Sequence, residues 1–248
     1  MSTAINIENV VKTYKGAENP SVNGLSLRVN EGEIYGLLGP NGAGKSSSVM
    51  MICGLLKADS GTINVLEQDV QNNGNAIRKR IGIATQEIAL FPSLTARENL
   101  HYFGNMYGLS GKKLQERITY LLEAFGLTSK ADKQVSSYSG GMKRRLNLIA
   151  SLLHEPELLI LDEPTAGVDV QSRNMIIDFL QSLNKTGVTM LYSSHLMEEA
   201  DRFCTRFGVI DEGKLIAEGT RDELLAANPD CRNLEELFLH HTGKSIRE

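Results

Sequence analysis

The segment GPNGAGKS, residues 39–46, places three glycines, a lysine and a serine at a spacing suited to holding an anion. Glycine permits backbone conformations that turn successive N–H groups toward a phosphate, while Lys45 adds positive charge and Ser46 a hydroxyl. An ordinary glycine-rich turn is the alternative, but an apolar strand pattern precedes the segment and a helical pattern follows it. The pattern is that of a phosphate-binding loop, so we expect nucleotide binding. The residues expected to contact the nucleotide here are Gly39, Asn41, Gly42, Gly44, Lys45, Ser46 and Ser47.

A pair of carboxylates ends the apolar run LLILDEP, residues 158–164. Ligands of open α/β sheets bind beyond the carboxyl ends of the strands, which is where this pair falls. Neighbouring strand residues point to opposite faces, so Asp162 and Glu163 should take different roles. We expect Asp162 to hold Mg²⁺ directly or through water, with Ser46 as the other protein contact, and Glu163 to polarise the attacking water as general base. A solvated turn before Pro164 is the alternative.

The segment YSGGMKRRLNLIASLL, residues 138–153, has the pattern of a second helix with an exposed N-terminus. Ser139 can cap this helix, and Gly140 and Gly141 leave its first amides uncovered. Alone, the segment is more simply interpreted as an ordinary capped helix. A phosphate-binding loop in the same chain favours a second anion-binding helix terminus.

The elements around these segments predict an α/β protein. Apolar runs in residues 3–38 predict antiparallel strands that lead into the strand before the phosphate-binding loop, and later runs predict strands at 81–85, 158–161, 188–192 and 207–211. Between Glu87 and Glu157 the strand patterns vanish, Thr95 and Glu98 form a capping-box pattern, and LQERITYLLEAFGL predicts an amphipathic helix. We therefore expect one domain, residues 1–248. Its parts would be an α/β core with an antiparallel β subdomain (1–86 and 158–232), a helical insertion (87–157) and a C-terminal helical tail (233–248).

Composition limits the possible partners and compartments. The 248 residues are 41% hydrophobic with net charge −4, and no basic run is longer than the short KRR at 143–145, so charge suggests neither nucleic acid nor anionic lipid. Three scattered cysteines fit neither a disulfide framework nor a zinc site and favour a reducing cytoplasm. No segment approaches the about 18 apolar residues that span a bilayer, and the N-terminus lacks an export signal. We expect a soluble, unexported chain that reaches a membrane only through a protein partner.

Six segments in order, GPNGAGKS, Gln86, SGGMK, LLILDEP, AGVD and His195, resemble the motifs of the nucleotide-binding subunit of ATP-binding-cassette (ABC) transporters over nearly the whole chain. The resemblance implies a P-loop NTPase core. In that family, two subunits pair head to tail and trap two ATP molecules, each between one subunit's phosphate-binding loop and the other's signature helix. It therefore implies ATP and Mg²⁺ as cofactors. The implied partners are a second nucleotide-binding subunit, with a homodimer favoured, and a transmembrane permease; no nucleic acid is expected.

The resemblance also implies roles for single residues. Tyr14 should stack on adenine, although packing is the alternative for a strand tyrosine. Gln86 should contact Mg²⁺ and the attacking water, and His195 should bind the γ-phosphate and position Glu163; an ordinary polar residue is the alternative for His195. Asp169 should lie at the dimer interface. The residues implied to contact the partner's ATP are Ser139, Gly140 and Gly141.

The chain departs from the commonest family pattern at Tyr138, Met142 and Val170, where leucine, glutamine and proline are usual. Because Ser139, Gly140 and Gly141 remain, the phosphate contact should persist. The segments GVDVQSR and LEELFLHHTG are similar to ABC-2 type exporter ATPases of the drug-resistance, sodium-extrusion and polysaccharide groups. We expect a Mg-dependent ATPase, peripheral on the inner face of the cytoplasmic membrane, that powers export.

Three other functions are compatible with parts of the pattern. An ABC ATPase that acts as a mechanical switch in a cell-envelope or division complex and transports nothing is left open by the sequence. A translation or DNA-repair cassette is less favoured, because such proteins usually carry two cassettes or zinc-binding cysteines. A GTPase is excluded because NKTG, residues 184–187, has glycine where guanine recognition needs a carboxylate.

Overall fold

The computed structural model describes residues 2–194 and 197–243. It divides into two compact units, which are described separately below. Unit 1 comprises Met1–Arg78 and Gly187–Glu248, and unit 2 comprises Lys79–Thr186. Unit 2 therefore contains the helical insertion together with the strand before it (Ile81–Ala84), the strand after it (Leu158–Asp162) and the next helix (Val170–Asn184).

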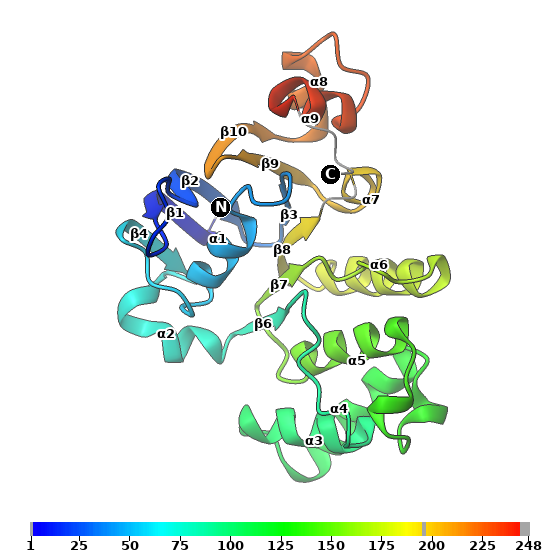
Figure 1. Cartoon of the computed structure of the whole chain (residues 1–248). Helices are drawn as coiled ribbons and strands as arrows, with labels where there is room; N and C mark the ends of the chain where they lie inside the picture. The colour runs from blue at the N-terminus through cyan, green and yellow to red at the C-terminus, as the bar shows by residue number, and fades with distance from the viewer. Residues whose placement is uncertain (1, 195–196, 244–248) are drawn as a thin grey trace. The chain divides into compact units, whose positions relative to one another are not determined.

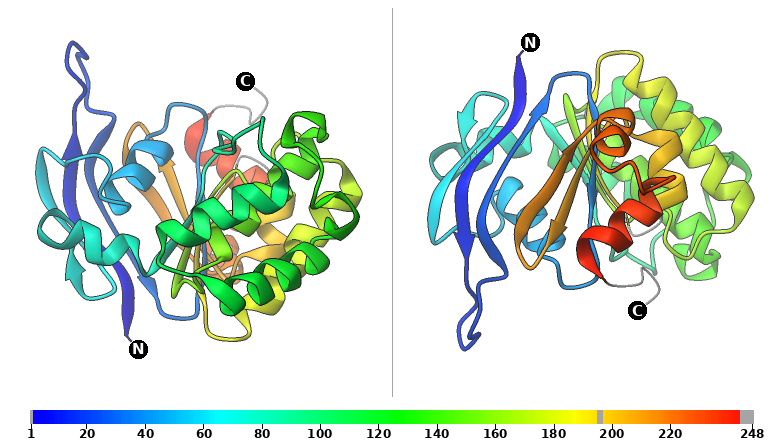
Figure 2. Two further views of the ribbon diagram at one scale, coloured as in Figure 1. Left: turned by 90° about the horizontal axis from the view of Figure 1, so that it is seen from below. Right: turned by 90° about the horizontal axis from the view of Figure 1, so that it is seen from above.

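Unit 1 contains an antiparallel sheet with the strand order β2-β1-β4-β5. Strand β1 (Thr3–Lys12) pairs with both β2 (Val22–Asn30) and β4 (Ser60–Val65), and the short β5 (Gln68–Asp69) pairs with β4. The long strands β1 and β2 are blue in both views of Figure 2. Every second or third residue of β2 is buried, as expected for a strand with one face against a core. The antiparallel strands expected at the N-terminus are confirmed.

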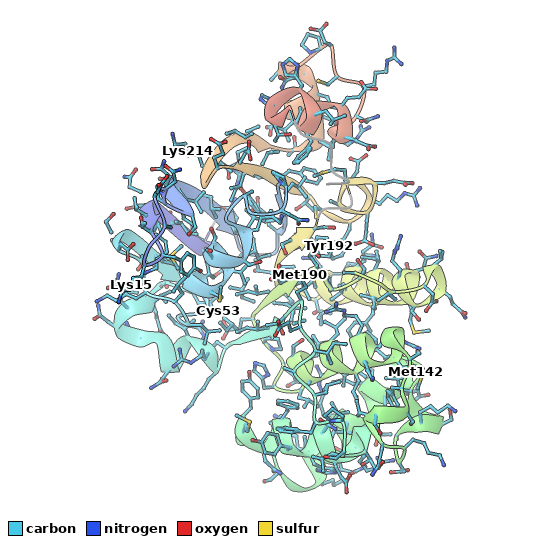
Figure 3. The ribbon with its side chains drawn as sticks, viewed as in Figure 1. Lys15, Cys53, Met142, Met190, Tyr192 and Lys214 are labelled. Atoms are coloured by element: carbon cyan, nitrogen blue, oxygen red, sulfur yellow. The ribbon has the colours of Figure 1, made fainter. Side chains whose placement is uncertain are left out.

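A second group of strands in unit 1 carries the phosphate-binding loop. Strand β3 (Ile34–Leu38) pairs in parallel with β8 (Thr189–Ser194) and with β9 (Arg206–Asp211), and β9 pairs antiparallel with β10 (Lys214–Gly219). All five residues of β3 are buried, which explains its uninterrupted apolar sequence. Figure 3 labels Met190 and Tyr192 of β8, both fully buried.

Helices complete unit 1. They are α1 (Lys45–Ile52), α2 (Val70–Arg78), α7 (Met197–Phe203), α8 (Arg221–Ala227) and α9 (Leu234–Thr242). Leu234, Leu237 and Phe238 of α9 are buried in one apolar cluster with residues of α7, α8 and β9. Helix α9 therefore packs its apolar face against the core of unit 1.

Unit 2 is mainly helical. Its strands β6 (Ile81–Ala84) and β7 (Leu158–Asp162) pair in parallel, and between them lie α3 (Ala96–Met106), α4 (Gly111–Ala124), two short 3₁₀ helices (Thr128–Lys130 and Val135–Ser137) and α5 (Gly140–Leu152). Helix α6 (Val170–Asn184) follows β7 (Figure 1). The helical character expected between Glu87 and Glu157 is confirmed.

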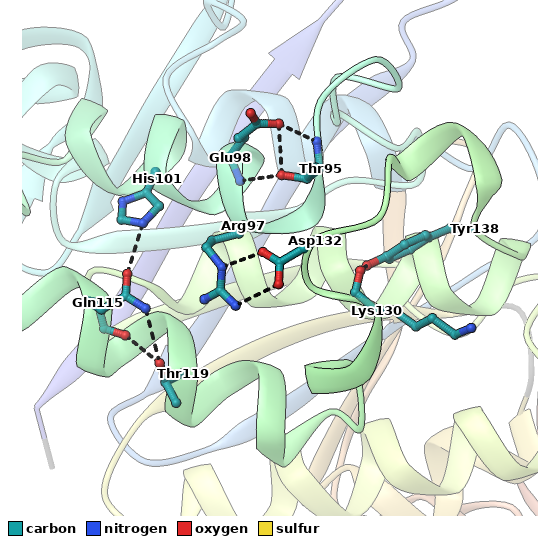
Figure 4. Close-up of polar contacts among 9 residues, drawn as sticks. All are labelled: Thr95, Arg97, Glu98, His101, Gln115, Thr119, Lys130, Asp132 and Tyr138. Atoms are coloured by element: carbon teal, nitrogen blue, oxygen red, sulfur yellow. Dashed lines mark hydrogen bonds and ion pairs between the residues drawn. The ribbon is translucent and has the colours of Figure 1, made fainter.

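Side-chain contacts fix the helices of unit 2 (Figure 4). Thr95 and Glu98 form the predicted capping box at the start of α3. Arg97 of α3 forms an ion pair with Asp132, with Nε 2.8 Å from Oδ1. The Tyr138 hydroxyl donates to the Lys130 carbonyl at 2.7 Å, so the tyrosine before the signature glycines anchors the preceding turn.

Strands β4, β5 and β10 are absent from the elements expected from the sequence. In β10 exposed and half-buried residues alternate up to the buried Gly219, and the strand includes two charged residues, so its apolar pattern is weak. Among the described residues, none of the helices has both the length and the apolar character needed to cross a membrane.

Candidate nucleotide site

The phosphate-binding loop joins β3 to α1 in unit 1, and its shape depends on glycine. Gly44 has φ of +102°, and a Cβ built on it would lie 2.3 Å from the Ser21 carbonyl oxygen. A Cβ on Gly39 would lie 2.4 Å from the Ile210 carbonyl oxygen. Gly39 is therefore required for close approach of two backbone segments, and not for a positive φ, which corrects the reason given by its motif alone.

Lys45 is buried and folded over the loop. Its Nζ donates hydrogen bonds to the Gly39 and Pro40 carbonyl oxygens at 2.7 and 3.0 Å. Helix α1 starts after Gly44, which has no side chain to accept from the N–H groups of the first turn. A cationic side chain and the N-terminus of a helix thus face the same short loop, an arrangement that suits phosphate oxygens.

Tyr14 lies two residues beyond the end of β1 in unit 1. Its ring is 41% exposed, and its hydroxyl is 3.1 Å from Ser47 Oγ. The structure therefore brings the residue expected to stack on adenine next to a residue of the phosphate-binding loop's helix. An exposed aromatic face is what base stacking requires.

The acidic pair lies at the end of β7 in unit 2. Asp162 is the last strand residue, and Glu163 leaves the strand with φ of +49°. We expected Glu163 to point away from Asp162 because of strand alternation, but Glu163 lies outside the strand. Its direction is set instead by a left-handed backbone conformation, which is uncommon for residues other than glycine. Both side chains are buried. Gln86, which follows the neighbouring strand β6, donates from Nε2 to Glu163 Oε2 at 3.2 Å.

The start of α5 has the geometry that its sequence predicted. Ser139 is the N-cap, and its hydroxyl accepts from the Met142 N–H at 3.3 Å. Ser139 and Gly140 are exposed, whereas Gly141 is buried, and Figure 3 labels Met142 in the first turn. A Cβ on Gly141 would lie 3.1 Å from Asp169 Oδ2.

Asp169 itself caps helix α6. Its Oδ1 accepts from the Ser172 N–H at 2.9 Å, and the hydrogen bonds from Ser172 lower the pKa of the Asp169 carboxyl. The side chain is thus held ionised beside the start of α5.

Three polar residues that the sequence did not identify hold the segment after β6. Arg144 donates from Nη1 to the Thr85 and Gln86 carbonyl oxygens at 3.0 and 2.7 Å. Asn147 accepts from the Ala89 N–H at 3.1 Å. Asn99, fully buried, binds both the N–H and the carbonyl of Phe91. For Asn99 the sequence held one indication, because this polar residue shares a helix face with Ala96 and Leu100, which are buried. For Arg144 the sequence held none.

The remaining expected residues are distributed as follows. Ser46, expected to bind Mg²⁺, belongs to unit 1, and the other two expected Mg²⁺ contacts, Gln86 and Asp162, belong to unit 2. His195 lies outside the described residues. His154, a histidine outside the expected site, stacks on Tyr107 with ring centroids 3.7 Å apart.

Comparisons with known proteins agree with this geometry. The sequence profile of the family described as ABC transporter matches residues 22–166. The chain is 48% identical over 217 residues to the linearmycin resistance ATP-binding protein LnrL of Bacillus subtilis, covering 88% of this chain and 69% of that protein. It is 44% identical over 232 residues to the Nod factor export ATP-binding protein I of Paraburkholderia xenovorans, covering 94% and 76%. It is 42% identical over 221 residues to the daunorubicin/doxorubicin resistance ATP-binding protein DrrA of Streptomyces peucetius, covering 89% and 66%.

Solved structures share the fold. An ATP-binding subunit of an ABC transporter superposes with a TM-score of 0.89 at 26% identity, covering 97% of this chain and 100% of the other. A dimeric ATP-binding cassette in a post-hydrolysis state, bound to ADP and Pi, superposes with a TM-score of 0.80 at 27% identity, covering 87% and 98%. The chain therefore belongs to the ABC transporter family, in which it is an ATP-hydrolysing subunit of the exporter type.

Proposed function

We propose that this chain forms a dimer around two ATP molecules and uses their hydrolysis to drive export through a separate permease in the cytoplasmic membrane, to whose inner face it attaches. The relatives named for export or drug resistance support the direction of transport. The dimeric cassette bound to ADP and Pi supports the assembly.

The residues present fit ATP and Mg²⁺. In unit 1 a Cβ at Gly39 or Gly44 would overlap the carbonyl oxygen of Ile210 or Ser21, so glycine lets the phosphate-binding loop keep its shape. Successive backbone N–H groups of such a loop can bind a phosphate. Lys45 would exchange its bonds to the Gly39 and Pro40 carbonyls for phosphate oxygens. The hydroxyl of Ser46 and the carboxylate of Asp162 are hard oxygen donors of the kind that Mg²⁺ prefers. When bound, Mg²⁺ supplies positive charge that stabilises the phosphates during transfer.

Hydrolysis is assigned to Glu163, and the hydrogen bond from Gln86 to Glu163 is the observation that carries this assignment. The amide of Gln86 donates to Oε2 at 3.2 Å, so the carboxylate is held in a defined orientation. A buried, oriented carboxylate suits a general base that polarises the attacking water. Gln86 thereby orients the group that would do the chemistry.

Dimer formation would complete each ATP site. Ser139 and Gly140 expose the N-terminus of α5 to a second molecule, where helix N–H groups can bind the phosphates of the partner's ATP. Asp169 lies beside Gly141 at the same place and would contact the dimer partner.

A permease segment would dock on an exposed apolar face of unit 2. The face consists of Phe91, Tyr102 and Met106, which are 41 to 68% exposed. The Phe91 ring packs edge-on against Tyr102 with centroids 4.8 Å apart, so the face is ordered. Exposed apolar faces of this kind mark sites of protein interaction. Because Phe91 follows Gln86 by five residues, a bound permease would act on the segment that orients Glu163.

Glu163→Gln tests the assignment of the base. The variant should bind ATP with wild-type affinity but hydrolyse it at least about 10²-fold more slowly, because the amide is a poor proton acceptor. Glu157→Gln is the matched control, since Glu157 belongs to the same unit but forms an exposed ion pair with Arg80. Near-normal turnover of Glu163→Gln would contradict the assignment.

Affinity purification of tagged Glu163→Gln from native membranes with Mg-ATP tests the export function. Recovery of a multi-span membrane protein is expected, and that protein then serves in transport assays. Recovery of only cell-wall, division or ribosomal components would contradict export and favour a mechanical switch.

A further inference from the structure

Arg144 occupies an unusual position in helix α5. It lies in the second turn after the Ser139 cap and is only 8% exposed. Arginine is rarely buried unless polar partners surround it. Burial lowers the pKa of the guanidinium, and the charges of Glu163 and Asp162 oppose that effect. The group stays cationic at neutral pH because arginine is effectively always protonated. A positive charge inside unit 2 therefore interacts with the charges of both carboxylates.

The guanidinium also holds the bend that follows β6. A single nitrogen, Nη1, donates to two consecutive carbonyls, those of Thr85 and Gln86. Consecutive carbonyls of an extended strand point in opposite directions, so both can accept from one donor only where the chain bends. The chain bends at Gln86. The backbone of Gln86 is thus fixed by Arg144, while its side chain donates to Glu163.

We propose that Arg144 is a positioning residue that sets Gln86 and Glu163 from the signature helix. The inference rests on the proposed roles of Glu163 and of Ser139. The start of α5 would bind the ATP held by the partner subunit, and Arg144, five residues further along the same helix, orients the groups that hydrolyse the subunit's own ATP. A shift of α5 on binding the partner's ATP is transmitted to the general base through one side chain.

The test compares Arg144→Met and Arg144→Lys with the wild-type protein in steady-state ATP hydrolysis. Arg144→Met keeps the length of the side chain but removes its charge and donors. Its kcat should fall by about 10- to 100-fold, because a misplacement of about 1 Å can cost about 10²-fold. The KM for ATP should stay within about twofold, because Arg144 contacts no residue expected to bind the nucleotide's phosphates or base. Arg144→Lys keeps the charge and can donate to a carbonyl, and should recover much of the lost kcat.

Arg117→Met is the matched control. Arg117 also lies in unit 2 and donates to a backbone carbonyl, that of Leu152 at 2.9 Å, but this carbonyl is at the end of α5 and away from Gln86. Its kcat should remain close to wild type at whatever melting temperature the variant has. Where Arg144→Met does not fold, Arg144→Leu, which also lacks both the charge and the N–H donors, is measured with the same expectation.

Wild-type kcat in Arg144→Met overturns the inference. So does an equal loss of kcat in Arg117→Met, or a lysine variant no better than methionine at equal stability. Glu163→Gln, assayed in parallel, separates this outcome from failure of the proposed function. If Glu163→Gln is inactive and Arg144→Met is normal, only the positioning role is wrong; if Glu163→Gln is active, the assignment of the base is wrong.

Discussion

Replacing Gly44 by alanine tests whether the phosphate-binding loop depends on glycine for its shape. Gly44 has φ of +102°, and a Cβ there would lie 2.3 Å from the Ser21 carbonyl oxygen. Alanine in a left-handed conformation costs about 1–2 kcal/mol, partly offset by about 0.4–1 kcal/mol because alanine restricts the unfolded chain. Relieving the overlap adds about 1–3 kcal/mol. Gly44→Ala should therefore lower the free energy of unfolding by about 2–4 kcal/mol.

Gly42→Ala is the matched control, because Gly42 has φ of +80° but a Cβ there would meet no described atom within 4 Å. It should cost only the backbone strain, about 1 kcal/mol. For 248 residues with an unfolding entropy of about 2.1 cal/mol/K each, 1 kcal/mol corresponds to about 2 °C. Thermal melts followed by circular dichroism should show Tm lowered by about 2 °C for Gly42→Ala and about 4–8 °C for Gly44→Ala. Equal shifts in the two variants would refute the role of the Ser21 carbonyl.

Three further changes have expected outcomes. Tyr138→Phe removes the 2.7 Å hydrogen bond to the Lys130 carbonyl and should lower the unfolding free energy by about 1 kcal/mol, a Tm change of about 2 °C in the same melts. Burial lowers the pKa of His154, so the folded protein favours the neutral ring. The contribution of His154 to the free energy of unfolding is therefore lost as the pH falls below about 6.5. His154→Gln should flatten the dependence of Tm on pH between about 7.5 and 5. Tyr14→Phe keeps the ring but loses the contact with Ser47, so the KM for ATP should change by less than about twofold, whereas Tyr14→Ala should raise it by about 5-fold or more if the ring stacks on the base.

The elements of the fold that could be predicted were those with long, regular patterns. Strand β3 is an uninterrupted apolar run because all its residues are buried, and α3 begins where Thr95 and Glu98 satisfy each other's backbone N–H groups. Strand β4 was missed because uncharged polar residues and a glycine interrupt its apolar pattern. Strand β10 was missed because Lys214 and Glu218 interrupt its pattern. Helix α4 begins at Gly111, three residues before the predicted amphipathic segment. This start was missed because the first turn is exposed and has no apolar residue to form a pattern.

The residues expected to do chemistry were found through motif spacing, which reflects local backbone geometry, and the residues that hold them were not. Thr85 and Gln86 accept from Arg144 across 59 and 58 residues of sequence, and no local pattern encodes such a contact. In the sequence Arg144 is the middle of a short basic run, where a charged residue is normally a solvated one. Its burial becomes evident only when α5 packs beside the end of β6. The sequence shows that residue 144 is an arginine, but only the fold shows that it contacts the segment holding Gln86. An interpretation of KRR as three surface charges would therefore overlook the residue that we propose links Ser139 to Glu163.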